Sequence, residues 1–463
     1  MKPVLTARDV AFSYAQGEAA LQGINLSVGA GECVVLCGKS GSGKTTISRL
    51  FNGLSPDFVE GELGGEAKTF ELVAGEAPIE DYVPLVGSVF QNPKTQYFHV
   101  NTTSELAFAC ENMGVEPAEI RRRIASRAEA FKITHLLDRR LHELSGGEKQ
   151  QIAFVAAGML DSPLLILDEI TSNLDRDAIE KLTVMIKKMK REGVTFLLTE
   201  HRLAWTRAFA DRYVLIEEGK LIRDWTLAEF DALSDEERNA LGLRSFHLDT
   251  NWARIQDKIT AVGDPEAPLR VHDLAVGYDK PVQSGLTGGF AAGQITGIMG
   301  HNGVGKSTLA RTLIGLMDPL AGSISWEGKP LTKKEALKLS FLVMQNTGYQ
   351  LFTDSVEDEV LMGAKHPEKK DEILEQLNIK HLAARHPMSL SDGQKQRVAI
   401  ASAILSGKKI LIFDEPTSGM DHYHMTAFGE ILADLKQFGV VMIVISHDED
   451  LMARWCDRIV VLD

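Results

Sequence analysis

Two glycine-rich segments of the sequence have the residue types and spacing of a phosphate-binding loop. They read GKSGSGKTT from residue 38 and GHNGVGKST from residue 300. Glycines let such a loop turn so that its N–H groups and the next helix's N-terminus face the phosphates. Lys44 and Lys306 would add a positive charge at the β- and γ-phosphate oxygens, and Thr45 and Ser307 a hydroxyl for Mg²⁺. The residues expected at the nucleotide are Gly38, Lys39, Ser40, Gly41, Ser42, Gly43, Lys44, Thr45 and Thr46, and then Gly300, His301, Asn302, Gly303, Val304, Gly305, Lys306, Ser307 and Thr308.

An aspartate followed by a glutamate ends an apolar run in each half of the sequence. The pairs are Asp168 with Glu169, after LLIL, and Asp414 with Glu415, after ILIF. The aspartate can hold Mg²⁺. The glutamate can polarise an attacking water, a contribution worth ~10²–10⁴ in rate. Alone, such a pair is more often an ordinary strand end, but beside two phosphate loops it predicts hydrolysis of a nucleoside triphosphate.

The motifs belong to an internal duplication. The phosphate loop returns after 262 residues, and the VFQN segment around Gln91 returns around Gln345 after 254. LSGGEKQQIA from Leu144 returns as LSDGQKQRVA from Leu390 after 246 residues, and the DE pairs and the histidines of TEH and SHD keep that offset. Five landmarks repeated in the same order predict two copies of one domain.

Short apolar runs are the elements that must position these motifs. VVLC and ITGIM precede the phosphate loops, and LLILDE, FLLTEH, ILIFDE and VMIVISH are apolar up to their last residues. Fully apolar runs are typical of a parallel sheet covered on both faces, and open α/β sheets bind ligands at the carboxyl ends of their strands. Cys33 and Cys37 lie inside one such run, so we expect them in a buried strand rather than in a metal site.

The duplication sets the expected domain boundaries. We expect the first domain at 1–240, a linker at 241–267 and the second domain at 268–463. Capping-box patterns beginning at Thr226 and Ser234 predict two short helices at the end of the first copy.

Composition excludes several classes of function. The net charge of -14 argues against a protein that wraps nucleic acid or lies on anionic lipid, because both need a basic face. The longest aliphatic runs, such as Val440–Ile445, are far below the ~18 residues of a membrane-spanning helix, and MKPVLTARDV has no secretory signal. We therefore expect a cytoplasmic protein that does not insert into the membrane and binds no nucleic acid.

LSGGE and LSDGQ, each about twenty residues before an apolar strand that ends in DE, resemble the signature of the ATP-binding-cassette (ABC) family. The resemblance implies two tandem P-loop NTPase domains in the α/β class. Each would have a mostly parallel core sheet, an antiparallel β subdomain and a helical signature subdomain. In that family two cassettes pack head to tail, so that each ATP lies between one phosphate loop and the other cassette's signature. Ser145, Gly147, Ser391 and Gly393 would then contact the γ-phosphate.

The same resemblance assigns further site residues. Gln91 and Gln345 would contact and sense Mg²⁺. The other expected Mg²⁺ ligands are Thr45, Ser307, Asp168 and Asp414. His201 and His447 would lie at the γ-phosphate and act in catalysis with Glu169 and Glu415. Tyr14 and Tyr278 would stack on adenine, although a core aromatic is the alternative for both. Asp392 replaces the first signature glycine; it either caps a helix or weakens one ATP site, and we expect modestly unequal sites.

QNPKTQYF and QNTGYQLF, followed by Glu105 and Glu359, are similar to the Q-loop region of energy-coupling-factor (ECF) importers for vitamins and transition-metal ions. That similarity implies an integral membrane scaffold of the T type, a separate substrate-capture membrane subunit, and a peripheral position on the inner face of the cell membrane. A surface loop that merely packs is the alternative for this motif. Two other functions stay open: a tandem-cassette translation factor acting on the ribosome, and the fused ATPase of a sugar importer.

Overall fold

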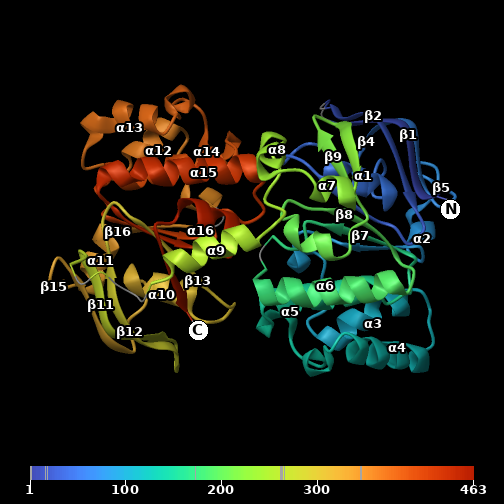
Figure 1. Cartoon of the computed structure of the whole chain (residues 1–463), viewed down its shortest axis with the longest axis horizontal. Helices are drawn as coiled ribbons and strands as arrows, with labels where there is room; N and C mark the ends of the chain where they lie inside the picture. The colour runs from blue at the N-terminus through green and yellow to red at the C-terminus, as the bar shows by residue number, and fades with distance from the viewer. Residues whose placement is uncertain are drawn as a thin grey trace. The chain divides into compact units, whose positions relative to one another are not determined.

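A computed structural model describes residues 3–15, 17, 19–172, 174–260, 264, 266–344 and 347–462. The chain forms two compact units, one of Met1–Phe246 with Gly419–His422 and one of His247–Ser418 with Tyr423–Asp463. Each unit contains a four-stranded antiparallel sheet and a larger, mostly parallel sheet (Figure 1). This mixed α/β architecture, present twice, confirms the predicted fold class.

The first unit has two sheets with non-sequential strand order. The antiparallel sheet has the order β2-β1-β4-β5, with β1 (Pro3–Tyr14), β2 (Ala19–Gly29), β4 (Gly61–Thr69) and β5 (Leu72–Val73). The larger sheet has the order β10-β9-β3-β8-β7-β6, with β3 (Cys33–Cys37), β6 (Val86–Val89), β7 (Leu164–Asp168), β8 (Thr195–Thr199), β9 (Arg212–Glu217) and β10 (Lys220–Thr226). Its strands pair in parallel except β10, which pairs antiparallel with β9.

The second unit repeats this plan. Its antiparallel sheet has the order β12-β11-β14-β15, with β11 (Leu269–Gly277), β12 (Pro281–Phe290), β14 (Ala321–Trp326) and β15 (Lys329–Pro330). Its parallel sheet has the order β16-β17-β18-β13-β19, with β13 (Ile295–Gly300), β16 (Ser340–Val343), β17 (Ile410–Asp414), β18 (Val441–Ile445) and β19 (Arg458–Leu462). The strand that enters the phosphate loop is therefore an inner strand of the parallel sheet in both units.

Burial on both faces explains the apolar runs. All five residues of β3 are buried, as are those of β8 and β18. In β3, Cys33, Val35 and Cys37 pack into one core cluster, whereas Val34 and Leu36 pack into another on the opposite face. Alternate residues of a strand point to opposite faces, so a sheet covered twice needs apolar residues at every position. The cysteines are buried and free, as predicted for a strand.

Helices complete both units. The first unit contains α1 (Lys44–Phe51), α2 (Ile79–Tyr82), α3 (Thr102–Asn112), α4 (Pro117–Ala130), α5 (Gly146–Ala157), α6 (Arg176–Arg191), α7 (Leu227–Asp231) and α8 (Asp235–Ala240). The second contains α9 (Asp249–Lys258), α10 (Lys306–Leu313), α11 (Lys333–Leu339), α12 (Val356–Leu361), α13 (Lys370–Gln376), α14 (Asp392–Leu405), α15 (His422–Leu435) and α16 (Glu449–Trp455). Capping boxes at Thr226 and Ser234 begin α7 and α8, which confirms the two predicted short helices.

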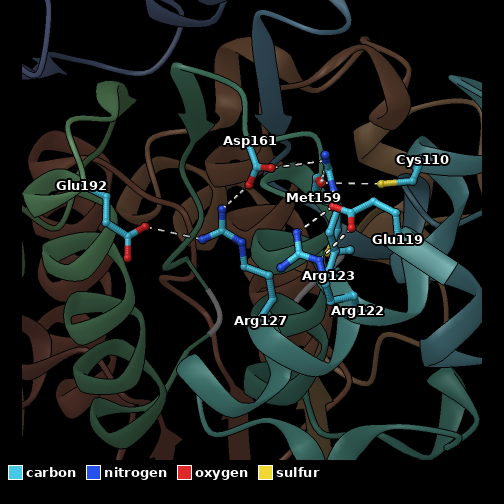
Figure 2. A network of polar contacts seen from close by, with 8 residues as sticks. All are labelled: Cys110, Glu119, Arg122, Arg123, Arg127, Met159, Asp161 and Glu192. Carbon is cyan, nitrogen blue, oxygen red and sulfur yellow. Dashed lines mark hydrogen bonds and ion pairs between the residues drawn. The ribbon is translucent and has the colours of Figure 1, made fainter. Parts of the chain in front are cut away.

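An arginine network joins α4 to the segments that follow α5 and α6 (Figure 2). Arg127 forms ion pairs with Asp161, at 2.5 Å, and with Glu192, the C-terminal cap of α6, at 3.5 Å. Arg123 bonds the same Asp161 at 3.2 Å and Glu119 of its own helix at 2.8 Å. Hydrogen bonds from the arginines Arg122 and Arg123 lower the pKa of Glu119 to about 2. The helical part of the first unit is thus tied to its parallel-sheet core through charged side chains.

The segment 241–267, expected to be a linker, contains a helix. Leu243 and Phe246 pack in the core of the first unit. The helix that follows, α9, lies on α16: Asn251 donates to Asp450 at 2.7 Å, and Lys258 Nζ donates to the carbonyl of Cys456 at 2.7 Å. Within the part of the chain that the structure describes, no helix is long and apolar enough to cross a membrane.

Candidate functional site

The two phosphate loops have one backbone geometry. Each loop lies between an inner strand and a helix, β3 and α1 in the first unit, β13 and α10 in the second. Gly38 and Gly300 have φ of 136° and 147°. A Cβ there would lie 2.1 Å from the carbonyl oxygen of Ile216 and 2.5 Å from that of Leu462, respectively. Only glycine fits at this position, because both the backbone angle and the neighbouring carbonyl exclude a side chain.

The loop lysine is held by the loop's own carbonyls. Lys44 Nζ donates to the oxygens of Gly38 at 2.9 Å and Lys39 at 2.8 Å. Lys306 Nζ repeats this arrangement with the two residues at the same places in the second loop, at 2.8 and 2.9 Å. Burial lowers the pKa of Lys44, and the charge of Glu169 opposes this shift. The ammonium is therefore fixed at the mouth of the loop, where it can meet phosphate oxygens.

A hydroxyl and a carboxylate come together where Mg²⁺ is expected. Thr45 Oγ1 donates to Asp168 at 3.2 Å, and Ser307 Oγ donates to Asp414 at 3.3 Å. Burial raises the pKa of both aspartates. Among the described residues no group of three or more His, Cys, Asp or Glu side chains could hold a metal by itself. The donor set fits Mg²⁺, which prefers oxygen ligands and is commonly shared between one carboxylate and substrate phosphates.

Glu169 is the centre of the polar contacts in the first unit. It has a left-handed backbone (φ 47°), and its carboxylate lies 3.0 Å from His201 Nε2 and accepts from Gln91 Nε2 at 2.8 Å. Burial alone would raise the pKa of Glu169, but the hydrogen bond and charge of His201 and the charge of Lys44 lower it overall. Burial lowers the pKa of His201. The lowered pKa keeps Glu169 charged at neutral pH, as a general base requires.

Glu415 and His447 form the same pair in the second unit. Their carboxylate and Nε2 atoms are 3.5 Å apart, and His447 Nε2 also lies 3.0 Å from Asn302 Oδ1. Glu415 shares the left-handed backbone, with φ 49°. Gln345, the predicted partner in this unit, lies outside the described residues.

The two tyrosines differ in their surroundings. Tyr14 is partly buried, and its hydroxyl lies 2.7 Å from Thr46 Oγ1. It lines one pocket of the first unit together with Lys44, Gln91 and Glu169. Tyr278 is 65% exposed and accepts from Arg311 at 3.1 Å. Tyr278 is thus an exposed ring, whereas Tyr14 borders the pocket and also packs against a buried core cluster. Stacking on adenine stays a prediction for both.

The signature residues begin helices α5 and α14. Ser145 and Ser391 are the N-caps, each in a capping box. A Cβ at Gly147 would lie 2.7 Å from Ala178 of α6, whereas one at Gly393 would meet nothing within 4 Å. Gly147 thus has a packing reason to be glycine as well as the predicted one. Asp392 is the first residue of α14 and not the cap, and its side chain lies outside what the structure describes.

Sequence reasoning missed three residues around this centre. Thr199 Oγ1 donates to Asp168 and also accepts from the N–H of Glu169 at 3.2 Å. Glu200 and Arg202 flank His201 and bond the segment that follows Glu169. The sequence gives one sign of these residues: TEHR in the first copy differs from ISHD at the matching positions of the second copy.

The sequence profile described as ABC transporter matches residues 21–172 and 284–418. The chain belongs to the ABC transporter family. A Treponema denticola protein named "Putative ABC transporter ATP-binding protein" is 41% identical and aligns with 99% of this chain and 95% of its own length. A Bacillus subtilis protein named "Putative HMP/thiamine import ATP-binding protein" is 31% identical over 99% of this chain and 90% of its own.

Among solved structures, cbiO1 from Clostridium perfringens, described as part of the ABC transporter complex cbiONQ, is 27% identical. It covers 51% of this chain and 93% of its own length, with a TM-score of 0.46. The family profile matches twice and the relatives align through both halves, so this ABC protein is an ATPase with two cassettes.

Proposed function

We propose that this ABC ATPase drives an importer of the ECF type that takes up a vitamin or a transition-metal ion. Its two composite ATP sites would form between head-to-tail cassettes, with each phosphate loop opposite the other cassette's signature. The chain would act at the inner face of the membrane with a T-type scaffold subunit and a substrate-capture subunit. The observation that carries the proposal is the geometry of the loop after the Q-loop glutamine, which is the same in both cassettes.

In the first cassette the side chains of a glutamine and a glutamate hold the backbone of this loop by hydrogen bonds. Gln96 accepts from the N–H of Phe90 at 3.2 Å and donates to the carbonyl of Ser88 at 2.9 Å. The buried carboxylate of Glu105 accepts from the N–H groups of Phe98 and His99 at 3.1 and 2.9 Å. Phe98 is nevertheless 75% exposed. Two polar side chains of the motif thus hold the backbone so that an aromatic ring faces outwards.

The second cassette repeats the arrangement. Gln350 accepts from Met344 N–H at 2.9 Å and donates to Leu342 O at 2.6 Å. Glu359 accepts from the N–H groups of Phe352 and Thr353 at 2.8 and 2.9 Å, and Phe352 is 77% exposed. A loop that merely packs would not need to expose a large apolar ring twice.

A cavity next to the first loop supports a docking role. It has a volume of about 520 Å³ and lies between the end of α1, β6 and the Q-loop, with Leu54, Val59 and Phe90 in its wall. Phe58, next to Val59 in the sequence, is 67% exposed. The cavity also reaches Gln91 and Asp168. A helix of the scaffold seated here would be linked through the Q-loop to the carboxylates of the ATP site.

The chain's own residues account for hydrolysis. Glu169, which is favoured in its charged form, accepts a proton from the attacking water, and His201 orients its carboxylate through Nε2. Lys44 and the loop N–H groups stabilise the phosphate charge. Thr45 and Asp168 would hold Mg²⁺, which neutralises the charge on the phosphates when bound.

Co-purification from detergent-solubilised membranes tests the partners. We expect the chain to be recovered with an integral membrane scaffold, and Phe98→Ser together with Phe352→Ser to reduce that recovery. Arg176→Ala, at an exposed ion pair with Glu180 on α6, is the matched control. Recovery with ribosomes instead would refute the importer and favour a translation factor. Recovery with an intact membrane pair of a sugar importer would refute the ECF assignment alone.

Among importers, the name of the Bacillus subtilis relative favours a thiamine-type substrate.

A further inference from the structure

The residues that flank His201 contact the segment directly after Glu169. This segment, of which the structure describes residues 170–172 and 174, lies between β7 and α6. Glu200, which is 2% exposed, accepts from Thr171 at both its N–H, at 3.3 Å, and its hydroxyl, at 2.7 Å. Its other carboxylate oxygen accepts from the N–H of His201 at 3.2 Å. One buried carboxylate therefore joins the segment to the backbone of the histidine.

Arg202 contacts the same segment through its backbone carbonyl groups. Its Nη1 donates to the carbonyl oxygen of Thr171 at 3.2 Å and to that of Leu174 at 3.1 Å. The peptide groups of Thr171 are thus satisfied on the N–H side by Glu200 and on the carbonyl side by Arg202. Buried backbone groups that lose such partners cost free energy, so the clamp resists rearrangement of the segment.

We propose that Glu200 and Arg202 are positioning residues of the first ATP site, which clamp the segment after Glu169 at Thr171 and Leu174 and thereby fix Glu169 relative to His201. The proposal rests on the proposed roles of Glu169 and His201 but not on the transport partners. The bonds described above join both residues to the segment after Glu169, so we expect the clamp to act through the glutamate–histidine pair and not through nucleotide binding.

The backbone of Glu169 explains why the segment matters. Glu169 has φ 47°, a left-handed conformation that costs energy for a residue with a side chain. Such a conformation persists only when the structure on both sides enforces it. The neighbouring strand β8 enforces it on one side, because the N–H of Glu169 donates to Thr199 O at 3.0 Å. On the other side, the clamped segment supplies the constraint.

The second cassette also bonds the matching threonine to a carboxylate, but this carboxylate comes from a different position in the sequence. Thr417, which matches Thr171, donates its hydroxyl to Asp448 at 2.8 Å, and Asp448 follows the histidine instead of preceding it. Ser446 stands where the first cassette has Glu200, and it donates to Glu415 at 3.3 Å. The threonine–carboxylate bond is therefore present in both cassettes, although the residue that provides it differs.

The first site can be measured alone in the full chain carrying Glu415→Gln, because this substitution removes the proposed general base of the second site. We expect Arg202→Ala to lower kcat by about tenfold, because small displacements of a catalytic group are costly, while KM and the affinity for a fluorescent ATP analogue stay unchanged. Arg202→Lys, which keeps the charge but cannot bridge both carbonyls as well, should lower kcat less; it carries the test if the alanine variant does not fold. Arg207→Ala, at the exposed ion pair with Asp231, is the matched control with unchanged kcat.

A swap between the cassettes provides a rescue. Glu200→Ser and Arg202→Asp should each lower kcat, since the first removes the carboxylate and the second places two carboxylates beside the histidine. The double variant recreates the SHD order of the second cassette, and we expect it to recover most of kcat.

Three outcomes would overturn the clamp alone, and a fourth would overturn the role of Glu169 on which it rests. An unchanged kcat in Arg202→Ala, or a loss of kcat matched by an equal loss of ATP affinity, would overturn the clamp. A double variant as poor as the worse single variant would also overturn it. If Glu169→Gln leaves the ATPase of this chain intact, the assignment of the glutamate itself fails, and the clamp fails with it.

Discussion

The two cassettes agree closely at the phosphate loop and differ around the histidine. Lys44 and Lys306 make the same two bonds with lengths that agree within 0.1 Å. By contrast, the glutamate and histidine are 3.0 Å apart in the first cassette and 3.5 Å in the second, where Asn302 lies at 3.0 Å from the histidine. Binding of a phosphate leaves little freedom to the loop, whereas the histidine can be supported in more than one way.

The helical subdomains differ even more. At the offset of 246 residues, Arg123 and Arg127 correspond to Lys369 and Ile373, and Asp161 corresponds to Gly407. The offset is supported by the helices, because α4 ends at residue 130 and α13 at residue 376. The network of Figure 2 is therefore a property of the first cassette. Duplicated domains thus keep the geometry that contacts the common ligand and lose other contacts independently.

The largest effect should come from the catalytic glutamates. Glu169→Gln and Glu415→Gln remove the general base from one site each, which costs ~10²–10⁴ in the rate of that site. We expect the residual ATPase of the two variants to differ modestly, because the contacts of His201 and His447 differ. Steady-state ATPase of the two single variants measures this, and identical residual rates would remove the predicted inequality.

The next effect tests a feature that the cassettes share. Glu105→Ala or Glu359→Ala leaves two backbone N–H groups without their acceptor, which should destabilise the loop by about 2 kcal/mol. Hydrogen exchange of residues 97–100 and 351–354 would report it. Glu359 also accepts from the hydroxyl of Thr353 at 2.9 Å, so we expect the larger increase in exchange in the second cassette. Equal exchange to the unmodified chain would show that the carboxylates do not hold the loops.

A pH dependence should distinguish the first cassette. Burial raises the pKa of Glu200 from 4.5 to about 7, with the charge of Glu169 adding to the shift and Arg202 opposing it. Between these values the folded state binds a proton that the unfolded state has lost, so the free energy of unfolding falls as pH rises through this window. Chemical denaturation from pH 4.5 to 7.5 should show this slope for the first unit, and Glu200→Gln should flatten it. Ser446 gives the second unit no such contribution.

The smallest effect concerns the arginine network. Asp161→Asn keeps a residue type that tolerates its φ of 58° and weakens two partly exposed ion pairs. We expect the unit to lose about 0.5 kcal/mol in its free energy of unfolding, since such pairs contribute little. Glu180→Gln, in an exposed i,i+4 pair on α6, is the control and should cost no more than that. A loss several times larger would show that the network does more than join two parts of the unit.

The sequence by itself determined the duplication, the fold class and the phosphate loops. These depend on local rules: glycine where the backbone turns, apolar residues throughout a doubly covered strand, and a polar residue at the strand's carboxyl end. Cys33 and Cys37 were assigned correctly to a buried strand for the same reason. Short capping boxes also sufficed for α7 and α8, because a capping box joins residues only three apart.

Only the tertiary structure decided which polar side chains meet. Glu200 and Thr171 are 29 residues apart, and Arg127 and Asp161 are 34 apart, so no local pattern pairs them. The helix α9, inside the expected linker, acquires its partners on α16 nearly 200 residues later. Gly147 gained a second reason to be glycine only once α6 was seen against it. Such contacts depend on how strands and helices pack, and a residue's type limits that choice without fixing its partner.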